Sequence, residues 1–191
     1  MLALEWLKNA RDIMTQIETT QLENIQKAAA IMADSIECGR WVHTFGCGHA
    51  TLPIEEMYPR IGGFVGFHPI IELPLTFFTN ITGQMGVHQF VFLERVEGYG
   101  VEIMKGHNFD KRDTMWLFSH SGINNVNIDV ALEAKKQGMK GIFGKNFNKG
   151  DKGAFAQDFL NLTDEQKTKL KELKDSLFVK PALRYSSTSL G

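Results

Sequence analysis

Two short stretches of the sequence place glycines and small polar residues beside groups that could move a proton or hold an anion. The first, HTFGCGHATLPIEEMYPR (residues 43–60), alternates glycines and then carries two adjacent carboxylates, Glu55 and Glu56. The second, SHSGINN (residues 119–125), combines two hydroxyls, a glycine and two asparagines. Glycine lets a backbone bend and approach a ligand closely. Both stretches are therefore candidates for a binding site.

The second stretch has the composition of a phosphate cradle. Ser119 and Ser121 offer hydroxyl donors, and Gly122 lets the backbone bend and expose its N–H group. Asn124 and Asn125 stand at the expected start of the next helix, where an asparagine suits the cap. The N-terminus of a helix presents unpaired N–H groups and a partial positive charge, which favour an anion. The alternative is a generic turn from strand to helix, capped by a serine.

The first stretch adds groups for acid–base chemistry. Proton transfer to or from a ligand needs a base with a pKa near neutral, and a glutamate half-buried beside the ligand can supply one because burial raises its pKa. Adjacent glutamates on a helix point about 100° apart, so at most one faces a ligand, and we favour Glu56. The alternative is an ion pair with Arg60. His49, directly after the glycines, could donate to phosphate or act as the acid.

Cys47 lies between Gly46 and Gly48 at an expected helix N-terminus, where the pKa of a thiol can fall. A small residue that fills tight space is the simpler interpretation. No H-x-x-x-H or similar spacing indicates a metal site, and we expect neither a metal nor a cofactor. The glycine patterns of nucleoside-triphosphate and dinucleotide sites are also missing.

The composition excludes other classes of function. The chain has 191 residues and a net charge of −1, whereas a general nucleic-acid binder needs a basic surplus. Its two cysteines predict reduced thiols rather than a disulfide framework. The sequence shows no signal-peptide pattern, and no apolar run reaches the roughly 18 residues that span a bilayer. We expect a cytoplasmic protein with no membrane or nucleic-acid partner.

The elements that must position these residues alternate along the chain. Apolar residues recur every three or four positions over residues 2–37 and predict one long helix, with a bend or break at Thr19 and Thr20. Strands are expected at 41–46, 64–73, 114–118 and 139–144, and helices at 50–57, 92–107 and 123–137. The segment 74–89 is expected to be an irregular loop. This alternation predicts a parallel sheet covered on both faces, with ligands at the carboxyl ends of its strands.

Four ordered segments, FGCGH, EEMYPRIGG, LERVEGYG and the S-x-S-G turn, resemble sugar isomerase (SIS) domains, and in particular the UPF0309-like phosphosugar isomerases. The resemblance spans about residues 2 to 143. It implies a three-layer αβα sandwich with a flavodoxin-like, five-stranded parallel sheet. It also implies a homodimer or higher oligomer formed through the long first helix. The resemblance further implies that the phosphate is held by Ser119, Ser121, Gly122 and Asn124, with Gly48 and His49 nearby.

The segment LERVEG is similar, more loosely, to the acidic helix of N-acetylmuramate 6-phosphate etherases, which are SIS proteins that use glutamate. This similarity makes Glu97 a second candidate catalytic carboxylate beside Glu56 and His49. Glu94, three residues earlier, shares its helical face. The alternative is that both side chains face solvent or pair with neighbouring charges.

The sequence thus predicts a single SIS-type domain over residues 1–191, with an atypical tail at 144–191 that lacks the expected serine/threonine loop. We expect the domain to bind a sugar phosphate and to isomerise it through a glutamate. Two alternatives stay open. The chain could sense the sugar phosphate without turning it over, or it could be an etherase-like lyase.

Overall fold

The computed structural model describes residues 2–58, 60–76, 86–120, 122, 124–145 and 156–157. Contacts between residues divide the chain into two compact units, Met1–Asn161 and Leu162–Gly191. The second unit lies outside the described residues. The prediction of one domain over the whole chain therefore stays a prediction, and the description below concerns the first unit.

The first unit is built on a five-stranded sheet in the order β2-β1-β3-β4-β5. Its strands are β1 (Val42–Gly46), β2 (Phe67–Pro69), β3 (Thr114–Ser119), β4 (Lys140–Lys145) and β5 (Ala156–Gln157). The first four strands run parallel, and β5 pairs with β4 in the antiparallel sense. The resemblance implied five parallel strands, so β5 departs from that expectation.

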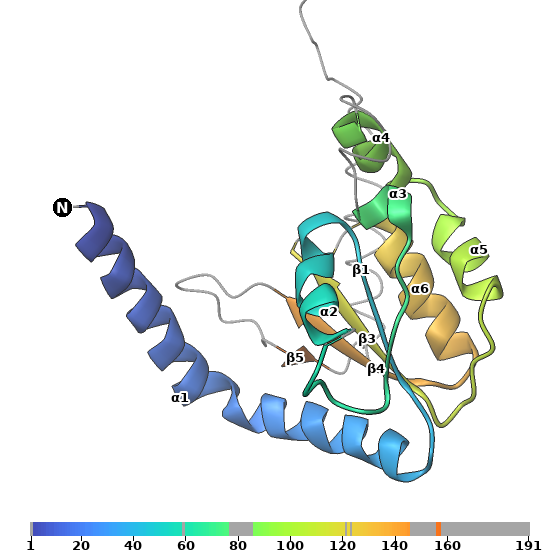
Figure 1. The fold of residues 1–191 in the computed structure, drawn as a ribbon, viewed down its shortest axis with the longest axis horizontal. Helices are drawn as coiled ribbons and strands as arrows, with labels where there is room; N and C mark the ends of the chain where they lie inside the picture. Colours follow the sequence, from blue (N-terminus) through green and yellow to red (C-terminus); the bar gives the residue numbers. More distant parts are fainter. Residues whose placement is uncertain are drawn as a thin grey trace, which may run out of the picture. The chain divides into compact units, whose positions relative to one another are not determined.

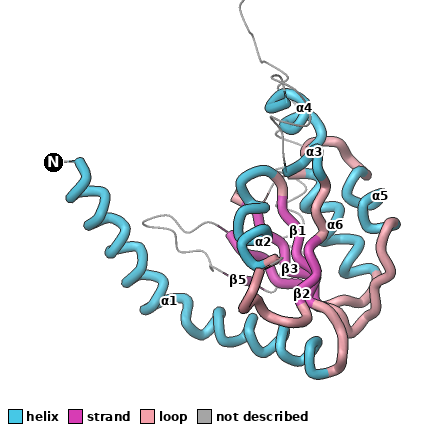
Figure 2. The backbone as a smooth tube through the Cα atoms, viewed as in Figure 1, coloured by secondary structure: helices cyan, strands magenta, loops and turns pink. Residues whose placement is uncertain are grey.

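Helices cover both faces of this sheet, as Figures 1 and 2 show. They are α1 (Leu2–Glu37), η1 (Gly48–Thr51, a 3-10 helix), α2 (Leu52–Met57), α3 (Leu73–Thr76), α4 (Gly86–Leu93), α5 (Tyr99–Lys105) and α6 (Asn125–Lys136). The end of α1 and all of α2 lie on one face, and α5 and α6 lie on the other. This arrangement confirms the predicted three-layer αβα fold with its long first helix.

Side chains of the strands alternate between the two faces. On β3, Met115 and Leu117 join Val126 and Val130 of α6 in the main hydrophobic core. Thr114 points to the opposite face, where its hydroxyl lies 2.8 Å from the hydroxyl of Ser35 at the end of α1. The sheet is therefore buried on both sides, as a parallel sheet requires.

The long helix α1 runs unbroken through Thr19 and Thr20. Their hydroxyls donate to the carbonyls of Thr15 (2.8 Å) and Gln16 (2.7 Å), four residues earlier. Such bonds bend a helix without ending it, and Figure 1 shows α1 changing direction near its middle. Gly39, in the left-handed conformation with φ of 70°, follows its end as expected. Among the described helices, none has the length and apolar character needed to cross a membrane.

Two segments differ from the sequence-based expectation. The helix predicted over 92–107 is divided, since Gly98 adopts a φ of 83° and donates its N–H to Oδ2 of Asp129 at 2.7 Å. The loop expected at 74–89 instead contains most of α3 and the first half of α4, with residues 77–85 outside the described part. The strand expected at 64–73 shortens to the three residues of β2.

Candidate functional site

The two turns singled out in the sequence follow neighbouring strands. β1 and β3 are adjacent and parallel, and Gly46 at the end of β1 pairs with Phe118 near the end of β3. The chain leaves both strands at the carboxyl edge of the sheet, where ligands of open α/β sheets bind. The structure therefore brings the glycine turn and the serine turn together.

Close packing explains the glycines of the first turn. A Cβ atom on Gly46 would lie 2.6 Å from the carbonyl oxygen of Ala50. Gly48 has a φ of 58°, and a Cβ atom there would lie 2.6 Å from the ring of Phe90 in α4. Gly48 itself is buried, and an aromatic ring is what approaches it. Its predicted contact with phosphate stays a prediction.

The second turn is held by a hydrogen bond of its own. The N–H of Gly122 donates to the hydroxyl oxygen of buried Ser119 at 2.9 Å, and Gly122 adopts a φ of 71°. The predicted N–H donor is thus used within the turn, whereas the Ser119 hydroxyl keeps a proton that it can donate. Ser121 lies outside the described residues.

The start of α6 is tied to the segment that follows α4. Asn124 occupies the N-cap position but makes no capping bond with its side chain. Its Nδ2 donates instead to Oε2 of Glu94 at 2.7 Å, and Nδ2 of Asn125 donates to the carbonyl of Arg95 at 2.6 Å. The expected position at the start of the helix is therefore confirmed for Asn124, but the side chains of both asparagines bind this neighbouring segment instead of the N–H groups of α6.

Cys47 is buried, with 6% of its surface exposed. Burial, and then the nearby charge of Glu94, raise the pKa of its thiol far above the ordinary value. Its sulfur lies 3.9 Å from Oδ1 of Asn127 in α6. The possibility of an activated thiol is not supported, and Cys47 serves as a small packing residue.

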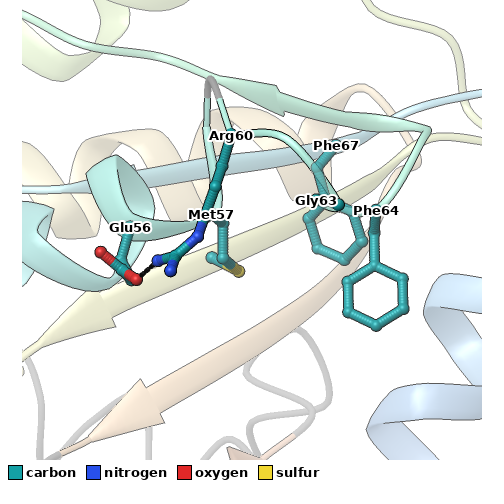
Figure 3. Close-up of a pocket in the computed structure, with 7 residues that line it drawn as sticks. Glu56, Met57, Arg60, Gly63, Phe64 and Phe67 are labelled. Atoms are coloured by element: carbon teal, nitrogen blue, oxygen red, sulfur yellow. Dashed lines mark ion pairs between the residues drawn. The ribbon is translucent and has the colours of Figure 1, made fainter.

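Glu56, the favoured catalytic carboxylate, lies elsewhere. It is exposed and forms an ion pair with Arg60, the alternative considered for it (Figure 3). Both line a cavity of about 170 Å³ that also includes Phe67. Phe67 pairs with Val42, the first residue of β1. This cavity is therefore near the amino ends of the strands, away from the two turns.

The other two predicted catalytic residues are also exposed. His49 lies in η1, directly after the first turn, and Glu97 lies in the segment between α4 and α5. Their catalytic roles stay predictions. In the described part of the chain, no group of three or more His, Cys, Asp or Glu side chains has the arrangement of a metal site.

Glu94 was not predicted from the sequence to be a functional residue. The sequence indicated it only as a neighbour of Glu97 on one helical face. Both carboxylates instead lie in the segment between the end of α4 at Leu93 and the left-handed Gly98, so they do not share the face of one helix. The available signal was the apolar run FVFL immediately before Glu94, since a carboxylate at the end of an apolar helix is easily half-buried.

A second polar cluster lies at the opposite, amino end of β1 and β3. Buried Asp113 accepts hydrogen bonds from Nε and Nη2 of Arg40, at 2.9 and 3.0 Å, and from the N–H of Trp41 at 3.1 Å. Nδ1 of buried His43 lies 3.0 Å from Nδ1 of His68, and its Nε2 lies 3.3 Å from Oδ2 of Asp113. This cluster joins the beginnings of the two strands.

Comparison with solved structures supports the fold. A phosphoheptose isomerase from Neisseria gonorrhoeae superposes with a TM-score of 0.58 at 13% sequence identity, covering 92% of this chain and 94% of the other. At this level of identity the likeness concerns the fold alone.

Comparison with other sequences identifies the family. A UPF0309 protein of Thermoanaerobacter pseudethanolicus is 29% identical over 168 residues, which are 83% of this chain and 66% of the relative. A UPF0309 protein of a Geobacillus strain is 36% identical over 116 residues, 61% of this chain and 44% of the relative. The chain thus spans about half to two thirds of these relatives. The family model of the SIS domain matches residues 5–142, and the chain belongs to the SIS domain family.

Proposed function

We propose that this chain binds a sugar phosphate at the turns that follow β1 and β3 and catalyses an aldose–ketose isomerisation. Membership of the SIS domain family supports the ligand class. The fold shared with a phosphoheptose isomerase supports the class of reaction. The observation that carries the proposal is the turn after β3, which holds its shape through the bond between Gly122 and Ser119.

The phosphate is proposed to lie at this turn, against the first N–H groups of α6. α6 has 12 residues, so its N-terminus carries the partial positive charge of a full helix. The hydroxyls of Ser119 and Ser121 would donate to the phosphate oxygens, together with the backbone of Asn124, and Gly122 would hold the shape of the turn through its bond to Ser119. Gly48 and His49 complete the proposed set from the neighbouring turn.

The reaction requires a carboxylate and an acid near C1 and C2 of the sugar. The sequence nominated Glu56, Glu97 and His49 for these roles, and all three stay within the proposal. One observation favours the alternative, a sugar-phosphate sensor without turnover. Glu56 pairs with Arg60 beside a different cavity, and a sensor needs only the phosphate cradle.

Incubation in deuterated water would separate the enzyme from the sensor. The probes are glucose 6-phosphate, fructose 6-phosphate and N-acetylglucosamine 6-phosphate, with unphosphorylated glucose as the ligand control. An enzyme exchanges the C2 proton of the two aldose phosphates, and a C1 proton of fructose 6-phosphate, for deuterium, which proton NMR follows. A sensor raises the melting temperature with a phosphosugar but exchanges nothing. If none of the three phosphosugars raises the melting temperature, the proposed function is wrong.

The cradle is tested by removing its hydroxyls. The double variant Ser119→Ala, Ser121→Ala should lose the stabilisation by a phosphosugar, because two donors to the phosphate are gone. Tyr58→Phe, which removes an exposed hydroxyl from the segment after α2, is the matched control and should keep it. Equal stabilisation of both variants would place the phosphate elsewhere.

We also propose that two copies of the chain associate through α1. Large apolar side chains stand exposed along the first two thirds of this helix: Leu2, Leu4, Trp6, Leu7, Met14 and Leu22. Its last turns, by contrast, are anchored on the sheet through Ser35. A monomer rarely exposes so extended an apolar stripe, and a second copy of the same helix would cover it.

A further inference from the structure

The end of α4 connects the two turns of the candidate site. Phe90 places its ring against Gly48 in the first turn. One helical turn later, Oε2 of Glu94 accepts the 2.7 Å hydrogen bond from Asn124 at the second turn. The carbonyl of Glu94 also accepts a hydrogen bond from the N–H of Val126 in α6, at 3.3 Å. A single short segment therefore touches both turns.

The carboxyl group of Glu94 lies between these turns. On one side it binds Asn124, and on the other its charge is close enough to Cys47 to raise the pKa of that thiol. Cys47 belongs to the first turn and Asn124 to the second. Within the described residues, the second carboxyl oxygen of Glu94 receives no hydrogen bond, which leaves it available to a ligand.

The surroundings of Glu94 suit a group that takes up and releases a proton. The side chain is half-buried, and burial raises its pKa above the ordinary value, although the charge of Arg95 opposes this change. Arg95 is the titratable group whose charge acts on Glu94. A carboxyl group with a raised pKa is a stronger base than an exposed one.

The two carboxylates nominated from the sequence lack this position. Glu56 is exposed and paired with Arg60 near the amino ends of the strands. Glu97 is exposed, three residues beyond Glu94 and next to the left-handed Gly98. Glu94 contacts the second turn directly and acts by its charge on the first.

We propose that Glu94 is the catalytic base of the isomerisation and faces the sugar carbons between the two turns. This inference rests on the proposed function. In an open-chain aldose phosphate, the Glu94 carboxylate takes the proton from C2. The electrons of that C–H bond form a C1=C2 double bond, and the carbonyl electron pair moves to O1, which takes a proton from an acid such as His49.

The second half of the reaction restores each group. The resulting enediol loses the proton of its O2 hydroxyl to the group that protonated O1, and a carbonyl forms at C2. The carboxylic acid of Glu94 then returns its proton to C1. The product is the ketose phosphate, and both residues regain their starting protonation states.

The test compares Glu94→Gln with the matched control Glu102→Gln, which changes an exposed glutamate of α5 that pairs with Lys105. A glutamine at position 94 keeps an oxygen that accepts the bond from Asn124, so the turn is preserved, but it cannot take a proton. With glucose 6-phosphate and N-acetylglucosamine 6-phosphate as probes, we expect Glu94→Gln to bind as the unchanged protein does. Its C2 proton exchange should fall by about 100-fold or more. Glu102→Gln should stay within a few-fold.

A second measurement tests the position of Glu94 without depending on turnover. In protein labelled with ¹³C at glutamate side-chain carboxyls, the signal that Glu94→Gln removes should shift when a phosphosugar binds. Binding without this shift, or full exchange by Glu94→Gln, would overturn the assignment of Glu94 and leave the proposed function standing. An unchanged protein that binds no phosphosugar would overturn both.

Discussion

Gly48 shows at the scale of one residue how the structure limits substitution. Its φ of 58° is strained for any other residue, and a Cβ atom would approach the Phe90 ring at 2.6 Å. Gly48→Ala should therefore lower the free energy of unfolding by about 2–4 kcal/mol, from backbone strain and steric overlap together. Urea denaturation measures this loss.

Gly39→Ala is the matched control for that substitution. Gly39 has a similar φ of 70°, but no atom lies within 4 Å of the place that its Cβ atom would occupy, so only the backbone strain remains. We expect a loss of about 1–2 kcal/mol. Equal losses for the two variants would show that the contact with Phe90 contributes nothing.

The spacing of residues predicted some of the site and missed the rest. The alternating glycines indicated a close approach of the backbone, but not that a ring from α4 makes it. The serines and Gly122 indicated a turn between strand and helix, which is present. Glu94 could not be selected because its position depends on the left-handed Gly98 and on Asn124, which is far from it in the sequence. The spacing of residues along the chain does not indicate the contact between Glu94 and Asn124.

Asp113 acts at the scale of elements, since it joins the beginnings of β1 and β3. Its side chain is fully buried and binds Arg40 through two hydrogen bonds. Asp113→Asn removes the charge and leaves Arg40 without its partner. We expect the free energy of unfolding to fall by about 3 kcal/mol, measured by urea denaturation at pH 7.

Glu102→Gln provides the comparison, because Glu102 pairs with Lys105 on the exposed face of α5. Solvent screens such pairs, and this variant should unfold close to the original midpoint. If Asp113→Asn is equally stable, the buried cluster does not hold the two strands together.

His43 gives the same cluster a dependence on pH. Burial lowers the pKa of folded His43 from 6.5 to about 4, so the unfolded chain takes up the proton first. The stabilisation that comes from keeping His43 neutral should be fully present above pH 6.5. The free energy of unfolding should then fall by about 3 kcal/mol as the pH decreases to about 4. Burial also lowers the pKa of His68, which acts in the same direction.

Urea midpoints between pH 7.5 and 4 test this dependence. His43→Gln should flatten the decline, whatever its effect on stability at pH 7.5, and His120→Gln, on an exposed position after β3, should leave the decline unchanged. A decline as steep in His43→Gln as in the unchanged chain would assign the effect to other groups.

At this scale, periodicity predicted the long elements well. The bounds of α1, β1, β3, α6 and β4 agree with the predicted segments to within about two residues. The failures are short or interrupted elements, namely β2, α3 and the divided helix around Gly98. These depend on tertiary contacts, such as the bond from Gly98 to Asp129, that outweigh local preference.

At the scale of the whole molecule, the exposed stripe of α1 predicts self-association. Sedimentation or light scattering should show a dimer, and the double variant Leu4→Glu, Trp6→Glu should shift it to a monomer. Charges within an apolar interface are costly because they lose their water on association. The fold of the monomer should be retained, as both side chains are exposed.

Leu132→Glu on α6 is the matched control. Leu132 is 57% exposed, close to the 62% of Leu4, but it lies outside the stripe. It should leave the oligomeric state unchanged. A monomer before any substitution, or a dimer that survives both changes on α1, would exclude association through this helix.

The overall architecture could be predicted from the sequence because strands and helices alternate and because four ordered segments resemble one family. The antiparallel β5 could not be predicted, since it has only two residues and no pattern of its own. By its sequence, SLFVKPAL at 176–183 is a candidate for a further strand, and it lies outside the described residues.

The edges of the described sheet have a consequence for behaviour at high concentration. At one edge, β2 has three residues, of which Pro69 carries no N–H group. At the other, the two residues of β5 cover β4. Exposed strands with regular unpaired backbone groups recruit strands from other molecules into fibrils. Among the described residues, the edges of this sheet are short, so we expect few backbone groups to be available for such growth.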